Sequence, residues 1–357
     1  MIRRPPYLSS RCRASKSALP ATMPPLPSRF LLTLERSVAS PSSDLALRHT
    51  GAFAAEIFPD LPIATTWGNL WKLAAWKPAA QASQPVSASN MDSSTDVRPA
   101  ALKVMTVAAN LRRMPQLQQR ILALTHSSAL HPPSSGSFDD SSKVVSMPRA
   151  ADALLMVSGS HPVRGLPGIS SLLHHSFDTL ALGARLRASG QLPPMTQLWA
   201  VANPNSEADA RLALRKVEAG AQVFVTQPPF DVQRFKAWVE DAASRGVWEH
   251  ARLVVGHPMI SSSSNLRFWL ALSLCSQLPS CKGLLASFLE QEAKGTKPDM
   301  QAFCQRYNEQ LLAEVLSWPC TSGLHVMPIT ARAKACTLEA LREGGMLHSL
   351  RAQPPLS

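Results

Sequence analysis

Short apolar runs alternate with amphipathic stretches over most of this chain. Apolar runs of strand length occur at residues 52–58, 102–108, 153–158, 198–202, 222–226, 253–256 and 324–327. Patterns with helical periodicity occur at residues 111–124, 170–189, 207–219, 232–245, 265–275, 299–316 and 331–342. Apolar strands that alternate with amphipathic helices predict an α/β protein with a parallel sheet covered by helices.

The number and spacing of the apolar runs favour a (β/α)8 TIM barrel. Seven candidate strands lie in a stretch close to the ~250 residues typical of that fold. An open, doubly wound sheet is the alternative, but no G-x-G-x-x-G motif follows any of the runs. The eighth strand is weakly marked. Residues 63–67 are the candidate, which leaves room for an irregular barrel around its second strand.

Composition divides the chain into a barrel and flanking segments. Residues 1–50 hold eight Lys and Arg against two acidic residues, and thus half of the net charge of +12. This segment is rich in Arg and Ser and poor in acidic residues, as an organellar transit peptide for chloroplast or mitochondrion would be. A basic disordered tail on a cytoplasmic protein is the alternative. We expect the barrel at 51–345, with disordered Ser/Pro/Ala-rich insertions at 78–100 and 127–148, and a tail at 346–357.

Several classes of partner are not expected. No apolar run reaches the ~18 residues that a membrane-spanning helix needs, so we predict no membrane partner. Aromatic residues make up only 6% of the chain and no nucleic-acid-binding motif accompanies the basic residues, so we predict no nucleic acid. The six cysteines form no C-x-x-C pair, so we predict no metal site and expect mostly buried, reduced thiols. A homo-oligomer is left open.

In TIM barrels, functional side chains gather at the C-terminal ends of the strands. Glu56 ends the first predicted strand among apolar neighbours, where a carboxyl group can serve as a general acid. The alternative is a partly exposed glutamate before a turn. After the run at 153–158, Gly159 in the sequence Ser158-Gly159-Ser160 lets a ligand approach the backbone closely, and the alternative is a plain turn.

The next two strand ends also carry polar residues. Asn203 ends the run at 198–202, and Asp209, Arg215 and Lys216 follow on a predicted helix. Asp209 and Lys216 are two helical turns apart and share a face, and adjacent cations can hold a pyrophosphate. The alternative is a solvated helix face. Gln227 ends the run at 222–226 and offers both a donor and an acceptor to a heterocycle such as a pterin.

The stretch AVANPNSEADARLALRKVEAGAQVFVTQPPFD at 200–231 resembles the flavin- and folate-binding half of methylenetetrahydrofolate reductases. The resemblance implies a compact, bacterial-type barrel that uses FAD and NAD(P)H. Its implied reaction converts 5,10-methylenetetrahydrofolate to 5-methyltetrahydrofolate in one-carbon metabolism and methionine biosynthesis. The segment Gly323-Leu324-His325 resembles the last strand of this family.

The resemblance also implies roles for individual residues. Glu56 would be the acid that protonates the folate, and Gln227 and Phe230 would contact the folate. The residues implied for FAD are Thr106, Ser158, Gly159, Ser160, Asn203, Asp209, Arg215 and Lys216. Ser160 stands where the family has an aspartate beside the flavin, and Val104 stands where it has a histidine. A non-catalytic barrel that binds folate or a protein partner is therefore the alternative function.

Overall fold

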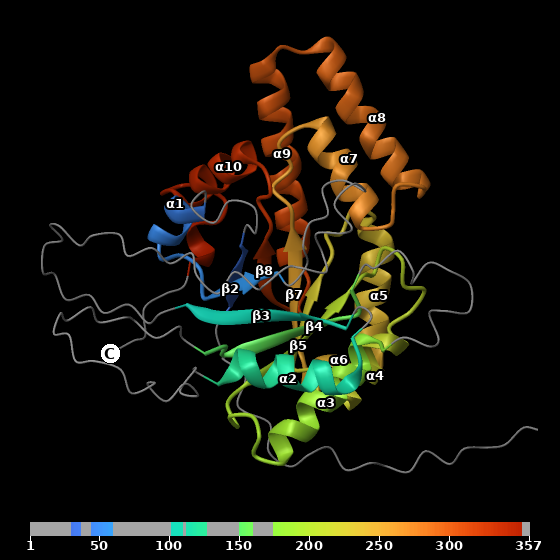
Figure 1. Cartoon of the computed structure of the whole chain (residues 1–357). Helices are drawn as coiled ribbons and strands as arrows, with labels where there is room; N and C mark the ends of the chain where they lie inside the picture. Colours follow the sequence, from blue (N-terminus) through green and yellow to red (C-terminus); the bar gives the residue numbers. More distant parts are fainter. Residues whose placement is uncertain are drawn as a thin grey trace, which may run out of the picture.

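Eight parallel strands close into one barrel (Figure 1). The computed structural model describes residues 30–36, 44–59, 101–109, 112–126, 150–159 and 174–351. The strands are β1 (Leu31–Glu35), β2 (Ala55–Phe58), β3 (Leu102–Ala108), β4 (Ala153–Val157), β5 (Gln197–Ala202), β6 (Val223–Thr226), β7 (Arg252–His257) and β8 (Thr321–Val326). Each strand pairs with the next in the chain, and β8 pairs with β1. The predicted TIM barrel is confirmed.

Helices surround the barrel on its outer side (Figure 1). They are α1 (Leu45–His49), α2 (Met114–Thr125), α3 (Ser176–Ala188), α4 (Arg211–Glu218), α5 (Val232–Ser244), α6 (Val247–His250), α7 (Ser263–Leu272), α8 (Pro279–Lys294), α9 (Lys297–Leu316) and α10 (Ala331–Leu341), with a short 3-10 helix, η5 (His348–Leu350). In the residues that the structure describes, none of these helices has the length and apolar character needed to cross a membrane.

The barrel begins earlier and ends later than the sequence predicted. Leu31, Leu32 and Leu34 are buried in β1, so residues 30–36 are part of the barrel and not of an N-terminal targeting or disordered segment. Residues 44–50 belong to it too, since α1 contacts α10. At the other end Leu347 is fully buried, so the tail assigned to 346–357 starts too early. The candidate strand at 63–67 and both predicted insertions lie outside the described residues.

Side chains alternate between the barrel interior and the layer beneath the helices. One apolar cluster fills the interior, and it includes Leu31, Ala55, Ile57, Val104, Leu155, Trp199, Val225 and Val254. Their neighbours in the strands belong to a second cluster under the helices, which includes Leu32, Leu34, Leu154, Leu198, Phe224, Leu253 and Leu324. Because alternate residues of a strand face the same side, Thr33 and Glu35 face the interior with Leu31. By the same rule Glu56 faces outward.

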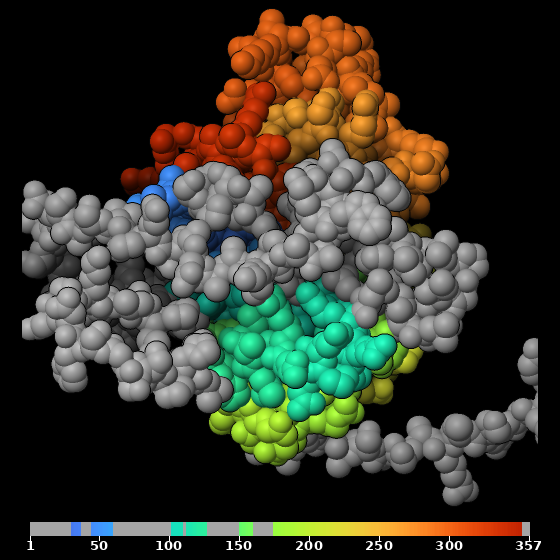
Figure 2. Space-filling model, viewed as in Figure 1, coloured from blue at the N-terminus to red at the C-terminus, as the bar shows by residue number. Residues whose placement is uncertain are grey.

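A helical extension interrupts the regular pattern between β7 and β8. Here the chain forms α7, α8 and α9, which project from the barrel body (Figures 1 and 2). These helices pack around an apolar cluster of their own, centred on Trp269, Phe288 and Cys281. The sequence pattern predicted α7 and α9 but not α8, because Pro279 and Gly283 in its first turns interrupt the apolar periodicity.

Candidate functional site

A hydrogen-bonded chain of three side chains lies at the C-terminal end of the barrel interior. Glu35 is the last residue of β1, and its Oε2 lies 2.9 Å from Nε2 of His325 on β8. The other ring nitrogen, Nδ1, lies 2.8 Å from Oγ1 of Thr33, which the strand register places opposite His325. Thr33 and His325 are buried, whereas 29% of the Glu35 side chain is exposed. Of these three side chains, Glu35 is therefore the one that a substrate can reach.

The two hydrogen bonds of His325 restrict where protons can lie in this arrangement. The Thr33 hydroxyl can donate to Nδ1 or accept from it. In either case, satisfying both hydrogen bonds requires one proton between Nε2 of His325 and Oε2 of Glu35. A partly exposed carboxyl group that is held in place by a buried imidazole has the geometry of an acid–base group.

Glu56, the predicted acid, lies in different surroundings. It is on β2 and not on the first strand. Its Oε2 accepts a hydrogen bond from Nη1 of Arg36 at 2.5 Å, and its Oε1 accepts one from Nε of Arg48 at 3.0 Å. The expected apolar surroundings are therefore wrong. Glu56 belongs to an ion-pair network beside α1, in which Arg36 also contacts Asp44.

Side-chain amides meet at the ends of β5 and β6. Nδ2 of Asn203 donates to the backbone oxygen of Ser273 at 2.9 Å, and Oγ of Ser273 donates to Oε1 of Gln227 at 3.3 Å. Nδ2 of Asn205 donates to Oδ1 of Asn203 at 3.2 Å. Ser273 follows α7, so the helical extension reaches back to the barrel here. Asn203 and Gln227, which the sequence singled out separately, thus share one partner.

The other predicted folate and flavin contacts are more scattered. Phe230 is buried in the apolar cluster of the helical extension, and its ring is not free to contact a ligand at the barrel mouth. Thr106 on β3 is buried and faces the interior, two residues after Val104. Oγ of Ser158 accepts a hydrogen bond from the backbone N–H of Ser176 at 3.0 Å, which positions the start of α3.

The backbone conformation at position 159 favours glycine. Its φ angle is +85°, in the left-handed region that side chains with a Cβ rarely adopt. The turn after β4 therefore requires glycine whether or not a ligand approaches. Ser160 lies outside the described residues.

The three residues predicted to hold FAD phosphates bind three different partners. Asp209 lies before α4 and not on it, because the helix begins at Arg211, and its Oδ2 pairs with Nε of Arg211 at 2.7 Å. Nζ of Lys216 donates to the backbone oxygen of Val201 at 2.6 Å, and burial lowers the pKa of this lysine. The predicted shared face of Asp209 and Lys216 is therefore wrong.

Arg215 is the exposed member of the predicted set. Its guanidinium carbon lies 4.5 Å from the ring centroid of Phe177, and this ring stacks on His175 with centroids 5.3 Å apart. The stack joins the start of α3 to α4. Because Asp209, Arg215 and Lys216 do not converge, these residues as arranged do not fit a single site for the phosphates of FAD.

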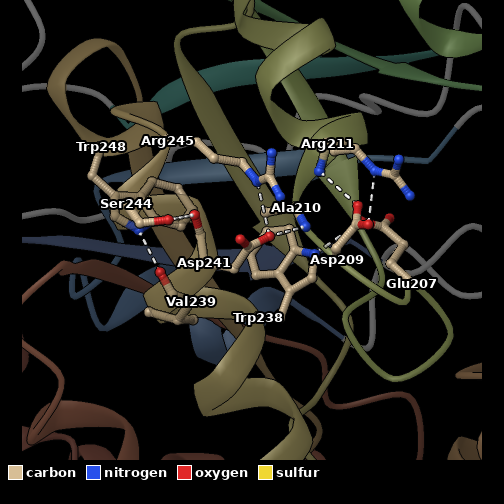
Figure 3. Close-up of polar contacts among 10 residues, drawn as sticks. All are labelled: Glu207, Asp209, Ala210, Arg211, Trp238, Val239, Asp241, Ser244, Arg245 and Trp248. Atoms are coloured by element: carbon tan, nitrogen blue, oxygen red, sulfur yellow. Dashed lines mark hydrogen bonds and ion pairs between the residues drawn. The ribbon is translucent and has the colours of Figure 1, made fainter.

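A cavity of about 290 Å³ lies between the loop after β5 and helix α5. Its lining residues are Glu207, Ala208, Asp209, Arg234, Ala237, Trp238 and Asp241. Asp241 accepts hydrogen bonds from the backbone N–H of Ala210 at 2.8 Å and from Nε of Arg245 at 2.9 Å (Figure 3). The hydrogen bond from Arg245 holds the pKa of Asp241 below its usual value.

The charged side chains around this cavity already have hydrogen-bond partners within the protein. Oε1 of Glu207 accepts from the backbone N–H of Asn203 at 3.0 Å, and its Oε2 accepts from Nε1 of Trp238 at 3.2 Å (Figure 3). Arg234 donates to the backbone oxygens of Pro204 and Glu207 at 3.3 Å. These contacts fasten the loop after β5 to α5. We therefore assign the cavity a structural role and place the candidate site at the barrel mouth.

Sequence reasoning missed Glu35, Thr33 and the partner role of His325. The signal was present in the mainly apolar residues 30–34, which an acid follows, but the basic, Ser-rich flanks outweighed it. Among the described residues, no group of three or more His, Cys, Asp or Glu side chains could hold a metal ion. The chain matches no protein-family model and no curated protein sequence.

Proposed function

We propose that this chain is an enzyme of the methylenetetrahydrofolate reductase type, with Glu35 as its acid. The observation that carries the proposal is the Thr33–His325–Glu35 chain at the C-terminal end of the barrel. Reductases of this family carry their acid on the first strand, and Glu35, not Glu56, ends the first strand here. Opening the methylene bridge of the substrate requires a proton on a folate nitrogen, and the partly exposed carboxyl group of Glu35 is the acid that the geometry offers at this end of the barrel.

The amide cluster supports a heterocyclic substrate. Oε1 of Gln227 accepts from Ser273, which fixes the orientation of the amide. The NH2 group of Gln227 can then donate to a carbonyl oxygen of a pterin. The side chain of Asn203 is held by two hydrogen bonds and its backbone N–H donates to Glu207, so Asn203 supports this arrangement from β5. Gln227 is thus the proposed substrate anchor.

FAD, when bound in such an enzyme, supplies the hydride that it receives from NAD(P)H. Since Asp209, Arg215 and Lys216 bind three separate partners, we derive no step through FAD from them. The same observation favours a second candidate function, a non-catalytic barrel that binds folate. Both candidate proteins bind folate, and only the reductase converts it to product.

The test compares Glu35→Gln with the wild type and with Glu56→Gln. The assay measures 5-methyltetrahydrofolate formed from 5,10-methylenetetrahydrofolate with NAD(P)H and added FAD, and calorimetry measures folate binding. We expect Glu35→Gln to lower turnover by roughly 10²- to 10⁴-fold while the folate Kd changes little. Glu56→Gln should leave turnover of the folded fraction near the wild-type value and lower stability by about 1 kcal/mol, because the ion pair with Arg36 is lost while Arg36 keeps its contact with Asp44.

Each outcome decides between the candidates. Full activity in Glu35→Gln would show that Glu35 is not the acid. A wild-type protein that binds folate but forms no product would favour the non-catalytic barrel. A folded wild type that binds no folate would contradict both candidates.

A further inference from the structure

Ser273 joins the helical extension to two polar strand ends at the barrel mouth. It follows directly after α7 and is fully buried. Its backbone oxygen accepts a hydrogen bond from Nδ2 of Asn203 at 2.9 Å, and its Oγ donates to Oε1 of Gln227 at 3.3 Å. One residue outside the barrel strands therefore contacts the side chains that follow both β5 and β6.

The end of α7 holds Ser273 in a fixed position. The backbone N–H of Leu274 donates to the backbone oxygen of Ala271 at 3.1 Å. The backbone N–H of Cys275 donates to that of Leu270, also at 3.1 Å. These two hydrogen bonds close the helix around a left-handed residue, which is Leu274 with a φ angle of +58°. A leucine stays in this conformation only where its surroundings fix it, so the turn after Ser273 is rigid.

The barrel fixes Ser273 from the other side. A backbone oxygen only accepts hydrogen bonds, so the group of Asn203 that faces Ser273 is its NH2 group. Oδ1 of Asn203 then accepts from Nδ2 of Asn205, which also donates to the backbone oxygen of Pro228 at 2.8 Å. The amide of Asn203 therefore has one orientation, and it holds the backbone of Ser273 in place.

The hydroxyl group of Ser273 determines which end of the Gln227 amide faces it. A buried hydroxyl hydrogen needs an acceptor, because a buried donor without a partner costs free energy. Among the described residues, Oε1 of Gln227 is the acceptor for this hydrogen. The NH2 end of an amide cannot accept it, so the NH2 group of Gln227 faces away from Ser273.

The Gln227 side chain lies where a ligand at the barrel mouth can reach it. It is half-buried, whereas the other residues of the stretch 221–230 are buried. Val223 and Val225 face the barrel interior. Gln227 continues their alternation, because its backbone N–H keeps the strand pairing with the backbone oxygen of Ala202. A ligand at the mouth therefore meets the donor end of this amide.

We propose, building on the function proposed above, that Ser273 sets the ligand selectivity of Gln227. With Oε1 held by Ser273, the amide presents only donors, so the site prefers a heterocycle with an oxo group over the same heterocycle with an amino group. The pterin of a folate has an oxygen at C4, and its 4-amino analogue has an NH2 group there. Two facing NH2 groups leave each other without an acceptor. Ser273 is thus a positioning residue that determines specificity through Gln227.

The test measures the Kd of tetrahydrofolate and of its 4-amino analogue by calorimetry on the full chain. We expect the wild type to bind tetrahydrofolate roughly 10- to 100-fold more tightly, because the analogue leaves the amide donor unpaired. In Ser273→Ala the amide is free to turn its oxygen to the analogue, and the ratio of the two Kd values should fall below about threefold. A purely structural loss would weaken both ligands alike and leave this ratio unchanged.

Two further variants sharpen the comparison. Ser280→Ala is the matched control, because Oγ of Ser280 in the first turn of α8 donates to Oδ2 of Asp231 at 2.8 Å and not to Gln227. It should keep the wild-type ratio. Gln227→Glu keeps an acceptor for the Ser273 hydroxyl and presents a second acceptor to the ligand, so it should prefer the 4-amino analogue.

The outcomes separate this role of Ser273 from the function proposed above. A wild type that binds both ligands equally, or a wild-type ratio retained in Ser273→Ala, would overturn the role of Ser273 and leave the reductase proposal standing. If Ser273→Ala does not fold, Gln227→Glu decides, and a retained preference for tetrahydrofolate would overturn the role. A folded wild type that binds neither ligand would contradict the proposed function and the role of Ser273 with it.

Discussion

His257 makes a quantitative prediction about acid stability. It is the last residue of β7, is fully buried, and has no hydrogen-bond partner for Nδ1 or Nε2 in the described part of the chain. A charged imidazolium at this position would lose its hydration without gaining a partner. Burial accordingly lowers the pKa of His257 from its ordinary value of 6.5 to about 4.

The size and sign of the effect follow from these two pKa values. Between pH 6.5 and about pH 4, His257 is protonated in the unfolded chain and neutral in the folded protein. The unfolded state then binds more protons, so the free energy of unfolding falls as pH falls through this window. At about 1.4 kcal/mol per pKa unit, His257 costs about 3 kcal/mol of stability once the pH lies below its folded-state pKa.

The substitution His257→Met removes the titrating imidazole and puts an apolar side chain of similar volume in its place. Because the ring makes no hydrogen bond, we expect no loss of stability near pH 7. Urea unfolding of both proteins, followed by tryptophan fluorescence from about pH 7 to about pH 4, gives the difference in stability at each pH. Other titrating groups cancel in this difference. Parallel pH profiles for the two proteins would refute the reasoning.

Two further predictions concern stability and use the same unfolding measurement. Asn308→Ala should lower the free energy of unfolding by about 3 kcal/mol. Oδ1 of Asn308 accepts from the buried backbone N–H of Ile260 at 2.9 Å, and Nδ2 donates to the backbone oxygen of Ile260 at 2.8 Å. A loss below about 1 kcal/mol would contradict this. Gly256→Ala should cost about 2 kcal/mol or more, because its Cβ would lie 2.3 Å from the backbone oxygen of Thr226. The matched variant Gly283→Ala on α8 meets no atom within 4 Å and should stabilise by roughly 0.5–1 kcal/mol, so equal signs for the two glycines would contradict the argument.

Local pattern was enough to predict the architecture. Strands buried on both faces appear as apolar runs, and helices on the outside appear as amphipathic stretches. The strands β3 to β8 and the helices α5, α9 and α10 therefore lie close to where the pattern put them. The strand β1 was missed because a five-residue apolar run carries little weight inside a basic, Ser- and Pro-rich segment.

Errors at the candidate site came from register and helix boundaries. The sequence pattern assigned Glu56 to the first strand. The structure shows that it lies on β2, with its side chain on the outer side of the sheet. A start of α4 at Arg211 leaves Asp209 in the preceding turn, where it pairs with Arg211. Shifts of one strand or of a few residues change which side chains meet, and composition does not reveal them.

By itself, the sequence determined most of the element types and favoured the parallel barrel, because these follow from the spacing of apolar residues along a short stretch of chain. It also marked Asn203 and Gln227 as polar strand ends. Only the tertiary structure decided which polar groups meet. Glu35 and His325 are 290 residues apart, and they are neighbours because closure of the barrel pairs β1 with β8. Their contact depends on the register of that closure, which no local segment specifies.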